Sequence, residues 1–76
     1  MAHYKNLGGN SGIVAYEIDS DSITVQFGSG QVRNYLYTYA SAGRENVEKM
    51  KSLARSGQGL HSFIMRNVKT GYERKW

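Results

Sequence analysis

The side chains of this chain that are most suggestive of chemistry are basic and aromatic, and the basic ones are unevenly distributed. Residues 49–76 carry seven basic side chains against one acid, a net charge of +6, whereas residues 1–48 carry three basic and five acidic side chains, a net charge of −2. Concentrated positive charge attracts polyanions over long range and gains affinity when counterions are released. The alternative interpretation is a solvated helical face that binds nothing.

A nucleic-acid-binding module, with RNA or another single-stranded nucleic acid as its partner, is therefore the first functional hypothesis. Unpaired bases would stack on Arg33 and on any exposed Tyr35, Tyr37 or Trp76. Trp76 has an alternative role to stacking on a base, which is to cover one rim of the core, as a large aromatic side chain can. Phosphates would be contacted by the seven basic residues of the C-terminal part, namely Lys49, Lys51, Arg55, Arg66, Lys69, Arg74 and Lys75.

The remaining polar residues form no pattern that is typical of an enzyme or a metal site. Asp19 and Asp21 fall in a turn and lack the further oxygen ligands of a calcium loop. His61 has no second histidine or carboxylate three or four residues later, as a metal or catalytic pair on a helix would require. The two short glycine turns lack the lysine and hydroxyl of a phosphate loop. We expect no catalysis, cofactor, metal ion or small-molecule substrate.

Size and composition predict one small folded domain. The chain has 76 residues, 39% of them hydrophobic and none of them cysteine, so core packing alone must stabilise the fold. A chain this short leaves little room for a large enclosed active site. Residues 1–11, which are rich in glycine and polar residues, are expected to form a flexible arm before a domain over 12–76. No segment resembles a signal peptide or membrane span, so we expect a cytoplasmic protein without membrane contact.

Alternating apolar residues predict the first two strands over residues 12–18 and 23–27, joined by a polar turn. Pairing Ile18 with Ile23 also brings Tyr16 opposite Val25 and Val14 opposite Phe27. The apolar sets of the two strands then match across the hairpin.

A third strand follows the glycine turn, and its register decides the role of two tyrosines. A two-residue loop turns Val32 and Leu36 towards the core and leaves Tyr35 and Tyr37 exposed as a stacking platform. A three-residue loop shifts the register by one residue and buries Tyr35 and Tyr37 against Val25 and Ile23. Burial is the commoner fate for two aromatic side chains on a small sheet, but either register satisfies the sequence.

Two helices are predicted after the strands. The first begins with Ser41 as its cap, ends at Gly57, and turns Val47, Met50, Leu53 and Ala54 to one side. The second runs over residues 59–69, with an apolar stripe of Leu60, Phe63, Ile64 and Val68. Residues 72–76 are expected to form a short closing strand or an ordered tail. The predicted fold is α+β, an antiparallel three-stranded meander followed by two short helices packed on one face.

The order of these motifs resembles the KTSC domain, a small module named for its occurrence at the C-terminus of some lysyl-tRNA synthetases. The resemblance implies an RNA-associated role, no established activity, and packing duty for Tyr35 and Tyr37. The family usually has a proline before the first helix, which this chain lacks, so the start of that helix stays open. The resemblance extends over residues 12–74 and is carried by Ile23, Val25, Phe27, Gly30, Tyr35, Tyr37, Ala54, Ser56-Gly57, Gly59-Leu60-His61-Ser62-Phe63-Ile64 and Tyr72.

The second functional hypothesis is a protein–protein interaction module or a homo-oligomer. A sheet with helices on one face leaves its other face and its edges uncovered. Ile13, Ala15, Tyr37 and Tyr39 are the residues expected to form an apolar patch there.

Overall fold

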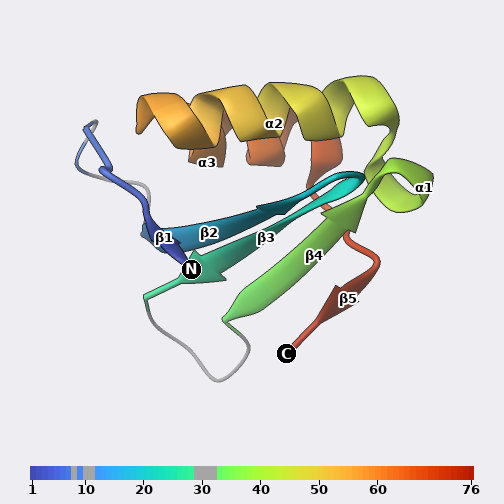
Figure 1. Cartoon of the computed structure of the whole chain (residues 1–76), viewed down its shortest axis with the longest axis horizontal. Coiled ribbons are helices and arrows are strands. Elements are labelled where there is room, and N and C mark those ends of the chain that lie inside the picture. Colours follow the sequence, from blue (N-terminus) through green and yellow to red (C-terminus); the bar gives the residue numbers. More distant parts are fainter. Residues whose placement is uncertain (8, 10–11, 29–32) are drawn as a thin grey trace.

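A five-stranded antiparallel sheet with helices on one face makes up the fold of the computed structural model (Figure 1). The structure describes residues 1–7, 9, 12–28 and 33–76. Neighbours in sequence are neighbours in the sheet, so the strands form a simple meander. The strands are β1 (Ala2–His3), β2 (Ile13–Asp19), β3 (Ser22–Phe27), β4 (Asn34–Thr38) and β5 (Arg74–Lys75).

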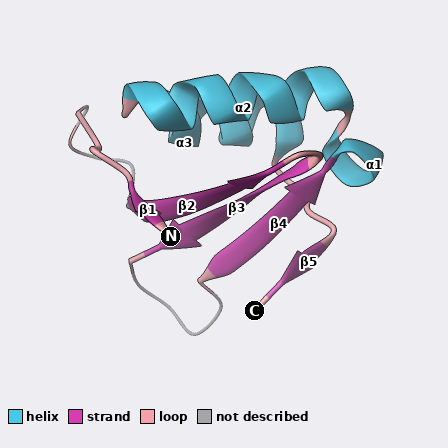
Figure 2. Cartoon of the chain, viewed as in Figure 1, coloured by secondary structure: helices cyan, strands magenta, loops and turns pink. Residues whose placement is uncertain are grey.

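The helices lie together over one face of the sheet, with a long α2 beside a second helical segment (Figure 2). This arrangement confirms the predicted α+β fold and the placing of the helices on one face. No helix among the described residues is long and apolar enough to cross a membrane. The helical elements are α1 (Tyr39–Ala42), α2 (Arg44–Ser56), α3 (Leu60–Phe63) and the π-helical η1 (Ile64–Val68), which continues α3 without a break.

The predicted pairing of β2 with β3 is confirmed except at its open end. Tyr16 lies opposite Val25 and Ile18 opposite Ile23, but a bulge between Ile13 and Ala15 places Ile13 opposite Phe27. Ile13 is consequently buried and Val14 is exposed. The expectation that Val14 faces Phe27 is wrong, because one extra residue in β2 reverses the alternation beyond it.

The register of β4 on β3 is the one that directs both tyrosines towards the core. Val25 lies opposite Tyr35, and Ile23 lies opposite Tyr37. The exposed stacking platform of the alternative register is therefore wrong: Tyr37 is only 1% exposed and Tyr35 is half-buried. The Phe27 N–H donates to the carbonyl of Arg33 at 2.7 Å. The predicted turn comprises residues 28–30, of which 29 and 30 lie outside the described part of the chain.

The expectation of a flexible arm over residues 1–11 is corrected for its first residues. Ala2 and His3 pair with β2, and Tyr4 is 2% exposed within the core. The Leu60 N–H lies 3.4 Å from the Tyr4 hydroxyl oxygen, to which it donates. An aromatic side chain of this size buries enough apolar surface to hold a short glycine-rich segment against the domain.

The first helix begins earlier than predicted and is interrupted. Thr38, not Ser41, is the N-cap of α1: its hydroxyl accepts from the Ser41 N–H, and the Ser41 hydroxyl accepts from the Thr38 N–H. Gly43, with φ +93°, then separates α1 from α2. This capping box has serine at the position where glutamate or glutamine is usual, so the sequence lacks the pattern that would identify Thr38 as the cap.

The end of α2 and the second helix follow the prediction. Gly57 has φ +80° and donates to the carbonyls of Leu53 and Ala54, as a left-handed helix cap does. Both predicted apolar stripes enter the core, where α2 packs on the sheet beside α3 and η1. The most buried members of these stripes are Val47, Met50, Ala54, Leu60, Ile64 and Val68.

Candidate functional site

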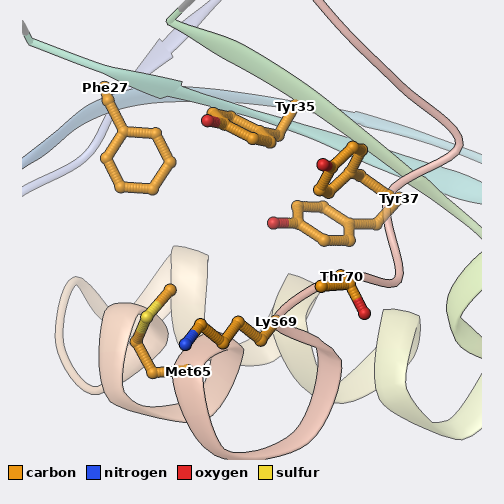
Figure 3. Close-up of a pocket in the computed structure, with 7 residues that line it drawn as sticks. Phe27, Tyr35, Tyr37, Met65, Lys69 and Thr70 are labelled. Atoms are coloured by element: carbon orange, nitrogen blue, oxygen red, sulfur yellow. The ribbon is translucent and has the colours of Figure 1, made fainter. Parts of the chain in front are cut away.

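An open pocket lies between the sheet and η1, with a volume of about 430 Å³. We call it the aromatic pocket. Phe27, Tyr35 and Tyr37 extend from the strands, and Met65 and Lys69 face them from the helical side (Figure 3). Its volume falls within the roughly 300–1,000 Å³ that is typical of ligand pockets. The complete lining is Phe27, Tyr35, Tyr37, Met65, Lys69, Thr70 and Tyr72.

The aromatic side chains hold one another by edge-to-face contacts. The centroid of the Tyr35 ring lies 5.5 Å from that of Phe27 and 5.2 Å from that of Tyr72. Tyr37 contacts Tyr72 at 6.4 Å, and His61 contacts Phe27 at 6.2 Å. Edge-to-face pairs are favoured by the ring quadrupoles and restrict ring orientation. The wall of the pocket is therefore a preorganised aromatic surface.

Local sequence explains how these rings come together. Alternation along β3 and β4 sends Phe27, Tyr35 and Tyr37 to the helix-covered face. After η1 the chain turns back towards the sheet at Gly71, whose N–H donates to the Val68 carbonyl at 2.7 Å. That turn delivers Tyr72 beside Tyr35, just before β5 joins the sheet.

The Tyr37 hydroxyl group belongs to this pocket and stays protonated over a wide pH range. Burial, with smaller contributions from Tyr35 and Tyr72, raises the pKa of Tyr37 to about 12. A neutral phenol both donates and accepts hydrogen bonds. The enclosed Tyr37 phenol is therefore neutral at any physiological pH.

The charge at the pocket is positive. Lys69 extends its ammonium group along the helical side of the pocket towards Met65 (Figure 3). No hydrogen bond or ion pair joins Lys69 to any residue in the described ranges. Lys75 lies across from Tyr35 in the sheet, with its ammonium 5.3 Å from the centroid of the Tyr72 ring. No carboxylate occurs among the described residues that line the pocket. These features favour an anionic ligand.

A second, more polar pocket of about 350 Å³ adjoins the aromatic pocket, since Lys69 and Thr70 line both. We call it the polar pocket. Arg66 and Asn67 of η1 line one side, and Ser41 of α1 lines another. Its lining also contains no carboxylate. Arg66 is exposed and makes no ion pair with a described residue, so its charge is available.

Trp76 and its basic neighbours form a third feature at the β5 edge. The Trp76 carbonyl accepts from the N–H groups of Arg33 and Asn34, at 2.9 and 2.8 Å. The Arg74 guanidinium lies 5.0 Å from the Trp76 ring centroid, and the Trp76 side chain is 48% exposed. The tail is thus ordered as a strand, and the indole is half open to solvent instead of sealing the core.

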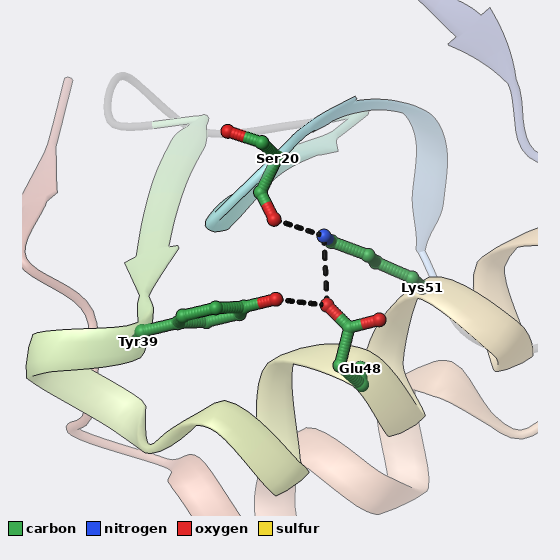
Figure 4. Close-up of polar contacts among 4 residues, drawn as sticks. All are labelled: Ser20, Tyr39, Glu48 and Lys51. Carbon is green, nitrogen blue, oxygen red and sulfur yellow. Dashed lines mark hydrogen bonds and ion pairs between the residues drawn. The ribbon is translucent and has the colours of Figure 1, made fainter.

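Lys51 differs from the other predicted phosphate ligands, because it is only 5% exposed. Its ammonium lies 2.8 Å from a Glu48 carboxylate oxygen and donates to the Ser20 carbonyl at 3.0 Å (Figure 4). The Tyr39 hydroxyl donates to the same Glu48 oxygen at 2.6 Å. Hydrogen bonds from Lys51 and Tyr39 lower the pKa of Glu48, and the bond to Glu48 raises the pKa of Tyr39. Lys51 therefore has a structural role, and its ammonium is not free to contact a phosphate.

The other predicted contact residues lie on separate surfaces. Lys49 and Arg55 are exposed on α2, away from its buried stripe. Arg66 and Lys69 line the pockets, and Lys75 lies beside Tyr72. Arg33 and Arg74 accompany Trp76 at the edge of the sheet. Arg74 lies opposite Leu36 and Lys75 opposite Tyr35, so Lys75 is on the pocket side while Arg74 and Trp76 are on the uncovered face of the sheet. The basic half of the sequence is therefore divided among the pocket side, the uncovered face of the sheet and the outer face of α2.

Two expectations about the tyrosines and the apolar patch are corrected by burial. Tyr37 cannot stack on a base as part of an open sheet face, and only the half-buried Tyr35 presents part of its ring, inside the aromatic pocket. The patch expected for self-association also does not form as drawn, because Ile13 and Tyr37 are both 1% exposed.

Sequence reasoning missed Phe27, Met65, Thr70 and Tyr72 as pocket residues. The available signal was Tyr72, three residues after the predicted second helix, and Lys69, one helical turn after Met65. Joining them requires the β3–β4 register and the π-helical turns of η1, neither of which has a sequence signature. π-Helical turns are frequent at functional sites.

The described residues contain no cluster of three or more histidine, cysteine or acidic side chains suited to a metal ion. Comparison with known proteins gives no matching family model, no matching curated protein and no matching solved structure. The function must therefore be inferred from the site itself.

Proposed function

We propose that this protein is a small non-enzymatic module that binds single-stranded nucleic acid. The observation that carries the proposal is that cations lie beside accessible aromatic rings on both faces of the β4–β5 edge, Lys69 and Lys75 near Tyr35 and Tyr72 on the pocket side and Arg74 near Trp76 on the uncovered face. Proteins that bind single strands combine a positively charged surface for the backbone with aromatic side chains on which bases stack. Lys69, Arg66, Lys75 and Arg74 supply the first feature, and Trp76 and Tyr35 supply the second.

Burial supports a revised set of contact residues. Lys51 and Tyr37 are removed, since the ammonium of one is neutralised by Glu48 and the ring of the other is enclosed. Arg33 remains, because it is exposed beside Trp76. Lys49 and Arg55 lie on the exposed side of α2, away from the two pockets, so substitutions of these residues can serve as controls. Backbone contacts by the remaining cations would give binding without strong sequence preference.

Membership of the KTSC family and an association with RNA form part of the same proposal. The motifs that carry the resemblance coincide with structural landmarks: Tyr37 is in the core, Gly57 caps α2, and Leu60 opens α3. The tRNA-synthetase context of that family favours RNA over DNA. The packing and capping roles of these motif residues support the resemblance in fold, and the RNA association remains part of the proposal.

Fluorescence anisotropy with labelled single strands tests the function. RNA and DNA oligonucleotides of mixed sequence should bind at low salt, and affinity should fall steeply as salt is raised, because phosphate contacts release counterions. Replacing Trp76 with alanine should weaken binding, since stacking of one base contributes about 1–3 kcal/mol. Replacing Leu7, another exposed apolar residue, is the matched control. Absence of binding at low salt would refute the proposal.

A protein-interaction module or homo-oligomer remains the alternative. The apolar patch on which it rested loses Ile13 and Tyr37 to the core. Sedimentation over a range of protein concentrations separates the two hypotheses, because the nucleic-acid proposal does not require self-association.

A further inference from the structure

We infer that the aromatic pocket and the polar pocket together bind one nucleotide, with the base in the first and its phosphate in the second. The inference rests on the proposed function and goes further, because it assigns a defined subsite to a single nucleotide. The two pockets adjoin through Lys69 and Thr70, which line both.

The aromatic pocket suits a flat, partly polar ring. The Tyr35 ring stands at 78° to the Phe27 ring and at 80° to the Tyr72 ring, so both ring faces and ring edges line the space. A base has a π-face for stacking and polar atoms on its edge. The exposed Thr70, which lines the pocket, carries a hydroxyl that can pair with such an edge.

The charges exclude the other ligand that aromatic pockets commonly select. Rings of tyrosine and phenylalanine also bind quaternary ammonium groups by cation–π attraction. Here the cations are already present in the protein: Lys69 lines the pocket and Lys75 lies over Tyr72. With no carboxylate in either lining, a cationic ligand would be repelled and an anionic ligand attracted.

The polar pocket supplies groups that suit a phosphate. Arg66 offers a guanidinium that can form two parallel hydrogen bonds to phosphate oxygens, and Lys69 adds a second positive charge. Asn67 contributes less, because its amide already donates to the Phe63 carbonyl at 3.2 Å. Lys69 stands between the two pockets, where it can contact the phosphate of a nucleotide whose base occupies the aromatic pocket.

The first experiment uses NMR titration of the whole protein with adenosine 5′-monophosphate and uridine 5′-monophosphate, and separately with inorganic phosphate and with adenosine. A nucleotide should shift the backbone amide signals of Tyr35, Lys69, Thr70 and Tyr72 together. Phosphate alone should shift the signals of the polar pocket only, and adenosine should bind more weakly than its monophosphate.

Two pairs of variants locate the binding. Lys69→Gln should weaken nucleotide binding by about tenfold, the usual order for a hydrogen bond to a charged group, whereas Lys49→Gln on α2 should leave it unchanged. Met65→Trp should fill the pocket and abolish the shifts, whereas Leu7→Trp should not. Met65 and Leu7 are both exposed, at 43% and 64%, so neither substitution enters the core.

The outcomes separate this inference from the proposed function. Shifts that are confined to the two pockets, that need more nucleotide in Lys69→Gln and that disappear in Met65→Trp support the inference, even if oligonucleotides fail to bind. Salt-dependent oligonucleotide binding with no response of the pocket signals overturns the inference and leaves the proposed function intact. Nucleotide binding that is unchanged in both pocket variants also overturns it.

Discussion

Lys51 shows how the environment of one side chain changes the meaning of its charge. It follows Met50 in α2, so its stem lies at the margin of the buried stripe while its ammonium reaches the Ser20 carbonyl in the β2–β3 turn. Glu48 neutralises the charge from the preceding helical turn. A lysine in this position joins a helix to a hairpin instead of serving as a ligand for phosphate.

Replacing Lys51 with alanine should destabilise the fold by about 1–2 kcal/mol, because a charge-assisted hydrogen bond and the packing of the stem are lost together. Replacing the exposed Lys49 with alanine should change the free energy of unfolding by less than about 0.5 kcal/mol. Urea denaturation of the two variants measures the difference. Equal effects would contradict the structural role of Lys51.

Tyr37 provides a prediction on pH dependence. Its pKa of about 12 in the folded protein exceeds the ordinary value of 10.0, so the unfolded chain loses this proton first as pH rises. The contribution to stability is complete below pH 10 and is lost between pH 10 and 12, reaching about 1 kcal/mol of loss at about pH 11.

Comparison with a Tyr37→Phe variant isolates this contribution. The free energy of unfolding should fall less between pH 7 and about pH 11 in the variant than in the wild type, by about 1 kcal/mol. Other tyrosines and lysines titrate in both proteins and cancel in the difference. Identical losses in both would show that Tyr37 ionises as freely in the folded state as in the unfolded one.

At the scale of elements, glycines at the junctions set where the helices end and what packs on them. Gly57 and Gly59 both have left-handed backbones, with φ of +80° and +83°. A Cβ atom on Gly57 would lie 2.7 Å from the Lys5 Cβ, whereas one on Gly59 would lie 3.5 Å from a Leu53 methyl carbon. The Gly57 carbonyl also accepts from the Leu7 N–H at 2.7 Å. The cap of α2 is thus a docking point for the N-terminal segment.

Alanine at either glycine should cost about 1–2 kcal/mol for the left-handed backbone. The Gly57→Ala variant should cost about 1 kcal/mol more than Gly59→Ala, because Lys5 must move to accommodate the methyl group. Thermal or urea unfolding gives both values. Equal losses of stability in the two variants would mean that Lys5 moves away from the new methyl group at no cost in free energy.

The elements also show what a sequence can predict and what it cannot. Strands, helix stripes and the Gly57 cap follow local rules of period and backbone freedom, and they were predicted from the residues that carry them. Local patterns do not predict the burial of Tyr4 or the bulge at Ile13, because both depend on contacts between distant segments. They also do not decide between Thr38 and Ser41 as the N-cap of the first helix. The aromatic pocket depends on the most distant contacts, since it joins β3, β4, η1 and Tyr72.

At the scale of the whole molecule, folding distributes a basic segment over three surfaces. The pocket side contains Arg66, Lys69 and Lys75, the uncovered face of the sheet contains Arg74 beside Trp76, and the outer face of α2 contains Lys49 and Arg55. The net charge of +4 attracts polyanions to all three. Only the first two also offer rings on which bases can stack.

Salt dependence distinguishes these surfaces. For single strands, the slope of log affinity against log salt concentration is about −0.7 per phosphate contact. A double variant Arg66→Gln and Lys69→Gln should therefore make the slope shallower by about 1.4 and weaken binding. The double variant Lys49→Gln and Arg55→Gln removes the same charge and should leave the slope nearly unchanged. If both pairs reduce the slope equally, the nucleic acid responds to net charge alone, and the pocket side does not direct it.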